Sequence, residues 1–117
     1  MGLYNFQPRF EAPIMAGTKT HTIRAERVHR DKPGATMHLY VGLRHPGARC
    51  LMRAVCSKVE QIRITETPLI FIDETPLDCS EAEQLARRDG FADFEEMMSF
   101  WEGRLPFKGH IYHWRKP

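Results

Sequence analysis

The sequence has few cysteines, no long apolar run and little net charge, and each shortage excludes a class of protein. Its three cysteines, Cys50, Cys56 and Cys79, are odd in number and include no CxxC pair, which argues against a disulfide framework or a zinc ribbon. No apolar run approaches the roughly 20 residues that span a bilayer. Arg9 and Glu11 stand where a signal peptide needs its apolar segment. We therefore expect a cytoplasmic protein with no membrane partner.

Length and charge set further bounds. At 117 residues the chain has room for one domain, residues 1–117, and it contains no internal repeat or long linker. A net charge of +2 permits a polyanionic partner without indicating one, and nothing indicates the oligomeric state. Of the six histidines only His110 and His113 are close in sequence, and a strand would point them to opposite faces. We expect no metal and no cofactor.

Hydrophobic periodicity predicts strands first and helices late, an α+β order. Such an order suits a small sheet curled into a partial barrel and flanked by a few helices. A cleft is expected where the first helix, the first strand and the late helices converge. The predicted helices cover residues 9–16, 78–88 and 92–102, and the predicted strands cover residues 19–24, 36–43, 49–64 (one bent strand or two), 69–72 and 110–114.

The segment 19–24 has the most informative chemistry. It follows Gly17, which sits where a left-handed helix cap is usual, and it places Lys19 at the mouth of a strand. The segment brings an ammonium group, hydroxyl groups and a guanidinium group close together, a set that suits binding an anion or activating a hydroxyl. The alternative is a strand with a solvated polar face. Alternation puts Thr20, Thr22 and Arg24 on one face of the strand, and His21 and Ile23 on the other.

Residues 9–24 resemble the opening signature of ASCH-domain proteins, in which the pattern I-x-x-G-x-K-x-x-T-x-R follows a short helix. In this chain the pattern runs from Ile14 to Arg24. Three later stretches resemble further parts of the family in the same order: the P-G turn and strand at 33–39, the central strand at 54–59, and the helix pair around an acidic-G-F element at 86–97. The resemblance covers nearly the whole chain.

The resemblance implies a PUA-like barrel, a fold associated with RNA and modified nucleosides. Small bacterial members of the family hydrolyse N(4)-acetylcytidine to cytidine and acetate with a lysine, a threonine and a glutamate. The lysine and threonine carry over to Lys19 and Thr22. For the carboxylate this chain offers Asp89, immediately before Gly90, with Glu83 as the fallback.

That chemistry gives each residue an expected role. Thr22 would attack the acetyl carbonyl, and Lys19 would be the base if burial or neighbouring Arg24 lowers its pKa. Asp89 would hold the lysine or bind the cytosine edge. Arg24, Thr20 and Tyr40 are the expected substrate-binding residues. Tyr40 or Trp114 could stack on a base, or either could serve as a strand or core residue. Backbone N–H groups near Gly17, or a side-chain donor, would stabilise the oxyanion.

Two functions from different classes remain open. The first is a metal-independent amidohydrolase acting on N(4)-acetylcytidine or a related acylated nucleoside. The second is an RNA-binding ASCH module, with or without ribonuclease activity, in which Lys19 and Arg24 contact phosphates and Thr22 hardly matters. If Lys19 faces the cleft, its replacement by methionine should change stability little.

Overall fold

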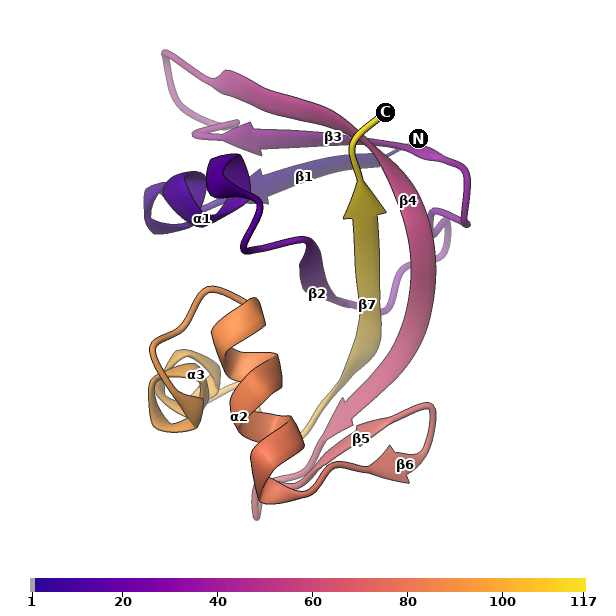
Figure 1. Ribbon diagram of the computed structural model, residues 1–117, viewed down its shortest axis with the longest axis vertical. Coiled ribbons are helices and arrows are strands. Elements are labelled where there is room, and N and C mark those ends of the chain that lie inside the picture. The colour runs from indigo at the N-terminus through magenta and orange to yellow at the C-terminus, as the bar shows by residue number, and fades with distance from the viewer. Residues whose placement is uncertain (1) are drawn as a thin grey trace.

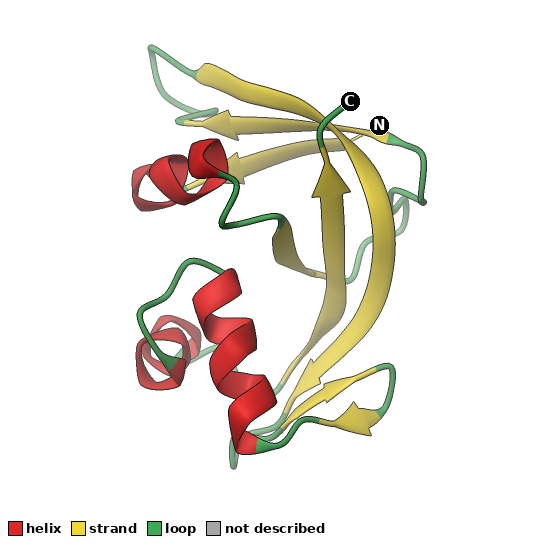
Figure 2. Cartoon of the chain, viewed as in Figure 1, coloured by secondary structure: helices red, strands yellow, loops and turns green. Residues whose placement is uncertain are grey.

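A computed structural model describes residues 2–117 and shows an α+β domain built on a curled sheet (Figure 1). Its five main strands form a half-barrel, β5 and β6 extend one end of that sheet, and the helices lie together on its open side (Figure 2). The strands are β1 (Gly2–Phe6), β2 (His21–Ala25), β3 (Thr36–Val41), β4 (Arg49–Ile64), β5 (Ile70–Ile72), β6 (Thr75–Pro76) and β7 (Phe107–Arg115). The helices are the 3-10 turn η1 (Pro8–Phe10), α1 (Glu11–Ala16), α2 (Cys79–Arg88) and α3 (Phe94–Trp101).

The long strand β4 organises the sheet. Its first half pairs antiparallel with β3, and its second half pairs antiparallel with β7 on the other edge. β1 joins β3 in parallel, and β2 joins β7 antiparallel, so the main order is β1-β3-β4-β7-β2. The register of β4 against β7 shifts between Cys56 and Lys58, an irregularity of the kind that bends a strand and increases its twist.

The curl of the sheet brings its two edge strands together. Arg24 on β2 donates a hydrogen bond from Nη2 to the carbonyl oxygen of Asn5 on β1, at 2.9 Å. β2 itself lies close against β7, because the carbonyl oxygen of Arg24 stands 2.1 Å from where a Cβ on Gly109 would be. Only glycine allows this approach, which fixes the strand that presents Thr22 and Arg24.

Aromatic packing joins the elements of the core. Phe6 on β1 meets Trp114 on β7 with ring centroids 5.9 Å apart, so Trp114 is a core residue and not a free stacking platform. On α3, Met97 and Trp101 are buried and belong to the same core. Among residues 2–117, no helix is long and apolar enough to cross a membrane.

Local signals placed most elements correctly. Asp78 caps α2 in a capping box with Glu81, and the helix ends before Gly90, as predicted. Gly17 caps α1 with φ +81° in the left-handed region, also as predicted.

The first strand and the first helix differ from the sequence expectations. β1 was not expected: it is five residues long, and its partner β3 lies some 35 positions further along the chain, so no local turn signal marks the pairing. The first helix is divided into η1 and α1, with Pro13 inside α1. Cys50 and Cys56 both lie in β4, where Cys50 is exposed and Cys56 is buried.

Candidate active site

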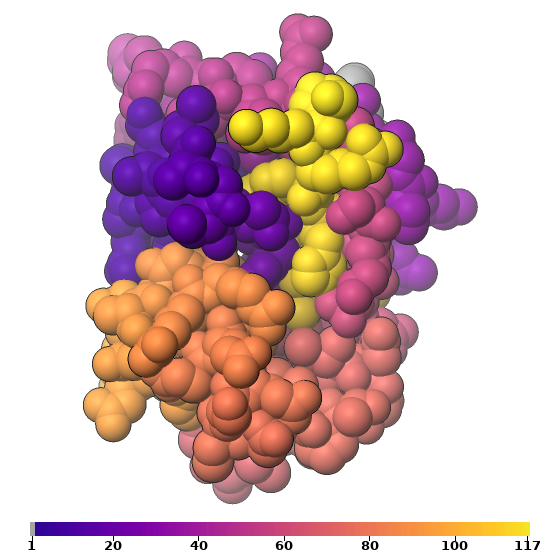
Figure 3. All heavy atoms as spheres, in the orientation of Figure 1, coloured from indigo at the N-terminus to yellow at the C-terminus, as the bar shows by residue number. Residues whose placement is uncertain are grey.

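A cavity of about 420 Å³ lies where the N-terminal segment, β2 and the helical region meet, as the sequence predicts. Its volume falls in the range of roughly 300–1,000 Å³ that is common for small-molecule sites. The N-terminal residues and the residues of α2 and α3 pack directly against each other (Figure 3). The rings of Phe10 and Phe91 are in contact at the cavity. Its aromatic lining is Phe6, Phe10, Phe91, Phe100, Trp101 and Phe107, and its charged and hydroxyl lining is Lys19, Thr22, Arg24, Asp89 and Arg104.

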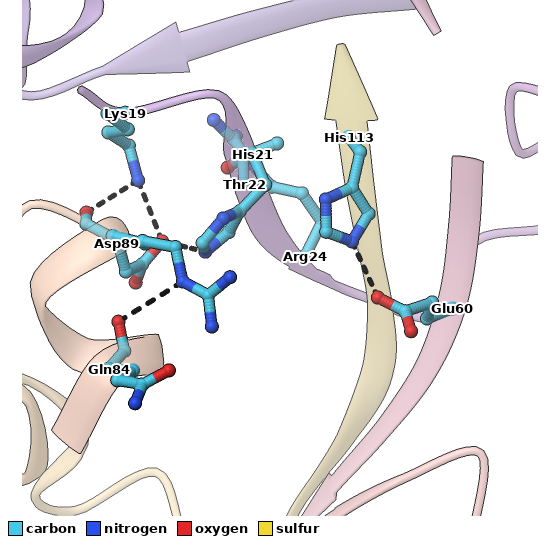
Figure 4. Close-up of polar contacts among 9 residues, drawn as sticks. Lys19, His21, Thr22, Arg24, Glu60, Gln84, Asp89 and His113 are labelled. Carbon is cyan, nitrogen blue, oxygen red and sulfur yellow. Dashed lines mark hydrogen bonds and ion pairs between the residues drawn. The ribbon is translucent and has the colours of Figure 1, made fainter. Parts of the chain in front are cut away.

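Lys19 is buried, with 3% of its surface exposed. The turn after α1 fixes its backbone, because the N–H groups of Thr18 and Lys19 both donate to the carbonyl oxygen of Pro13. Its side chain passes over the ring of Phe10, with Nζ 4.9 Å from the ring centroid. Nζ then donates two hydrogen bonds of 2.7 Å to Asp89, one to the backbone carbonyl oxygen and one to Oδ1 (Figure 4).

Asp89 owes its position to the end of α2. It is the first residue after the helix, and its N–H still donates to the carbonyl oxygen of Leu85. Gly90 follows with φ +102°, a conformation that turns the chain sharply, and a Cβ there would stand 2.9 Å from the ring of Phe10. The Asp-Gly pair therefore directs both a carboxylate and a helix-terminal carbonyl at Lys19, and the negative end of a helix favours a cation.

Burial and ion pairing have opposite effects on the pKa values of Lys19 and Asp89. Burial lowers the pKa of Lys19 below its ordinary value, and nearby Arg24 lowers it further, while Asp89 opposes the shift. For Asp89, burial acts to raise the pKa, but His21 and Lys19 outweigh it, so that the carboxyl pKa lies below its usual range. The site thus holds a firmly ionised carboxylate beside a lysine that releases its proton more readily than a solvated lysine does.

Thr22 and Arg24 are joined to each other on the cavity side of β2. The Nε of Arg24 donates to Oγ1 of Thr22 at 2.9 Å, and Thr22 is only 4% exposed. Burial lowers the pKa of Arg24 to about 10, with a further contribution from Arg27, so Arg24 remains a cation at neutral pH. A permanent positive charge therefore touches the threonine oxygen, which favours negative charge developing there.

The other face of β2 carries a second set of polar groups that the sequence analysis did not use. The Nε2 of His21 lies 3.2 Å from Oδ1 of Asp89, the same oxygen that Lys19 binds. The ring of His21 lies 5.5 Å from that of His113, and His113 is 2.6 Å from Glu60 (Figure 4). The two histidines are direct neighbours in the β2–β7 ladder, a pairing between distant segments that no local pattern indicates.

The structure gathers Lys19, Thr22, Asp89 and Arg24 at one cavity and leaves the other candidates outside it. Thr20 is exposed and precedes β2, where its carbonyl oxygen accepts a hydrogen bond from the N–H of Trp114. Tyr40 is half-buried on β3 and does not line the cavity. Glu83, the fallback carboxylate, instead accepts a hydrogen bond from the N–H of Phe94.

Within residues 2–117, no three His, Cys, Asp or Glu side chains are grouped as the ligands of a metal ion would be.

Comparison with solved structures supports the fold. No family model matches the sequence, and no curated protein matches it. The crystal structure of ASCH from Zymomonas mobilis superposes with a TM-score of 0.60 at 18% identity, covering 97% of this chain and 66% of that chain. A Tyr-to-Phe variant of that protein gives a TM-score of 0.60 at 17% identity over 97% of this chain and 68% of the other, and a Ser-to-Ala variant gives 0.59 at 18%.

This chain therefore spans about two thirds of the length of those proteins. The curled sheet, the three helices on its open side and the superposition agree with the fold that the opening signature implies. The chain has the ASCH fold, a PUA-like α+β domain.

Proposed function

We propose that the protein is an amidohydrolase that removes the acetyl group from N(4)-acetylcytidine or a related acylated nucleoside. The observation that carries this proposal is the buried Lys19–Asp89 pair, which lines the same cavity as a threonine hydroxyl bonded to Arg24. The aromatic lining supports a flat heterocyclic substrate, because nucleobases bind well against aromatic faces. The resemblance of residues 14–24 to the ASCH opening signature supports the choice of substrate.

In the first step of the proposed reaction, Oγ1 of Thr22 attacks the acetyl carbonyl carbon while neutral Lys19 Nζ takes the hydroxyl proton. The carbonyl then re-forms, the bond to cytosine N4 breaks, and Nζ returns the proton to N4. Cytidine leaves, and an acetyl ester remains on Thr22. Water adds to this ester as Nζ takes a water proton. Collapse releases acetic acid, and Oγ1 recovers its proton. No step requires a metal.

Arg24 is the donor best placed to stabilise the oxyanion in these steps. The N–H groups of Gly17, Thr18 and Lys19 already donate to carbonyl oxygens of α1, so the turn near Gly17 does not supply free donors. Arg24 contacts Thr22 through Nε and Asn5 through Nη2, and it lines the cavity together with the reacting hydroxyl. A charged donor fixed before the reaction is the arrangement that lowers such a barrier.

The alternative, an RNA module that contacts phosphates through Lys19 and Arg24, has less support. Lys19 is buried and directs its ammonium group to Asp89, and Arg24 directs its guanidinium to Thr22 and to β1. Phosphate contacts usually come from exposed cations that exchange bound counterions. If the module function holds nonetheless, the affinity for a short single-stranded RNA will fall steeply with salt and Thr22→Val will leave it unchanged.

We expect the purified protein to release cytidine and acetate in equal amounts from N(4)-acetylcytidine, with a rate that rises with pH to a plateau. The rate rises with pH because Lys19 must be neutral to act as the base, and activity is lost as pH falls below the pKa of Lys19. Because that pKa is lowered, the midpoint of the rise should lie below the pKa of about 10.4 of a solvated lysine.

Liquid chromatography of timed samples measures this profile, and a parallel series with a chelator tests the metal-independent mechanism. No cytidine at high enzyme concentration would refute the substrate assignment. Turnover that stops with the chelator would refute the mechanism.

A further inference from the structure

His21 is a buried titratable group for which the proposed mechanism has no use. Only 3% of its surface is exposed, and its Nε2 is enclosed 3.2 Å from Oδ1 of Asp89. It does not line the cavity that would hold the substrate. A buried ring nitrogen that faces the carboxylate of the catalytic pair suggests a role beyond packing.

Its surroundings form a row of ionisable groups that leads from the cavity to the outside of the sheet. His113 on β7 lies beside His21, and Glu60 on β4 lies 2.6 Å from His113. The exposed Lys58 is 3.5 Å from the other oxygen of Glu60. The ionisable groups that face His21, directly or through His113, are therefore Asp89 after α2, Lys19 before β2, His113 on β7, and Glu60 and Lys58 on β4.

Lys19 and His21 share one carboxylate oxygen of Asp89. Oδ1 of Asp89 lies 2.7 Å from Nζ of Lys19 and 3.2 Å from Nε2 of His21. Any N–H or positive charge that His21 presents to Oδ1 reduces the negative potential that this oxygen offers to Lys19. A protonated His21 would also repel the ammonium group directly. Both effects lower the pKa of Lys19, so that a larger fraction of it is neutral, and able to act as a base, at a given pH.

We propose that His21 is a positioning residue, which competes with Lys19 for Oδ1 of Asp89 and so weakens the hold of that carboxylate on the lysine proton. The effect of His21 on activity rests on the proposed function. The pairing of Lys19 with Asp89, and the influence of His21 on that pair, do not depend on the proposed function.

The test compares His21→Phe and His21→Gln with the wild type by two measurements. The first is the pH dependence of kcat on N(4)-acetylcytidine, and the second is an NMR titration of Lys19 in protein labelled at the lysine side chains. In His21→Phe we expect both the rise of kcat with pH and the titration of Lys19 to move upward by about one pH unit. At a fixed pH on the rising part of the profile, kcat should therefore be about tenfold lower than in the wild type. In His21→Gln, whose amide can still donate to Oδ1, the shift should be smaller. KM should stay the same, because His21 is outside the cavity.

His110→Phe is the matched control. His110 is likewise a buried histidine, but it stands on β7 and lies on the opposite face of the β2–β7 pair, next to Arg30 rather than Asp89. Its replacement should leave both measurements unchanged.

The outcomes separate the two proposals. An unchanged Lys19 titration in both His21 variants overturns the role of His21, whatever the activity. An upward shift of that titration in a protein that does not hydrolyse N(4)-acetylcytidine supports the role of His21 and refutes the proposed function. If His21→Phe does not fold, the His21→Gln titration decides the question alone.

Discussion

Lys19→Met should abolish hydrolysis and also lower the free energy of unfolding by about 3–5 kcal/mol. That is the usual cost of removing one partner from a buried ion pair, because the other charge is left buried and uncompensated. Here the remaining charge is Asp89, of which only 6% is exposed, with Nε2 of His21 3.2 Å from its Oδ1. This expectation corrects the one drawn from the sequence, in which a cleft-facing Lys19 could be replaced at little cost. The structure buries Lys19 and pairs it.

Denaturant unfolding measures the stability loss, and Lys108→Met is the matched control. Lys108 is exposed and stands 3.9 Å from Glu26, a surface pair of the kind worth about 0–1 kcal/mol. Lys19→Arg separates charge from basicity, since a guanidinium stays protonated and cannot act as the base. Activity that survives in Lys19→Arg would defeat the role of Lys19 as base. Equal stabilities of Lys19→Met and Lys108→Met would show that the buried pair does not form.

Thr22→Val should eliminate hydrolysis, whereas Thr22→Ser should keep a measurable rate. Valine has nearly the shape of threonine but no hydroxyl, and serine keeps the hydroxyl that attacks the substrate. The valine variant also leaves Nε of Arg24 without its acceptor, a loss that we expect to cost about 1–3 kcal/mol. The variant should therefore melt at a lower temperature but remain folded under assay conditions.

Rates and thermal melts of both Thr22 variants must be compared together. If the losses of activity follow the melting temperatures, Thr22 has only a structural role. If Thr22→Val retains the wild-type rate while folded, the threonine is not the nucleophile and the cavity requires a different mechanism.

Sequence reasoning succeeded where the information is local. The bounds of α2, the glycine cap of α1 and the strand that begins after Lys19 each depend on a few consecutive residues. For the same reason, the lysine, threonine and arginine of the site could be singled out: their spacing in one short segment places them near one another whatever the rest of the chain does.

The remaining parts of the site depend on contacts between distant segments. Asp89 is 70 positions from Lys19, and only the family resemblance singled it out before the structure showed the contact. His21 was placed correctly on the face opposite Thr22, but its partners, Asp89 and His113, come from α2 and β7. The contact of Arg24 with β1 could not be anticipated, because β1 itself was not predicted. A histidine alternating with isoleucine in a predicted strand is the one sequence signal that could have drawn attention to His21.

The most direct test of the central claim is a crystal structure of Thr22→Val with N(4)-acetylcytidine, since this variant should bind the nucleoside without consuming it. We predict that the base lies against the aromatic lining of the cavity and that the acetyl carbonyl carbon faces position 22, at about 3–3.5 Å from where the hydroxyl would be. A nucleoside bound elsewhere, an acetyl group directed away from position 22, or an empty cavity at saturating ligand would contradict the proposal that Thr22 and Lys19 form an amidohydrolase site.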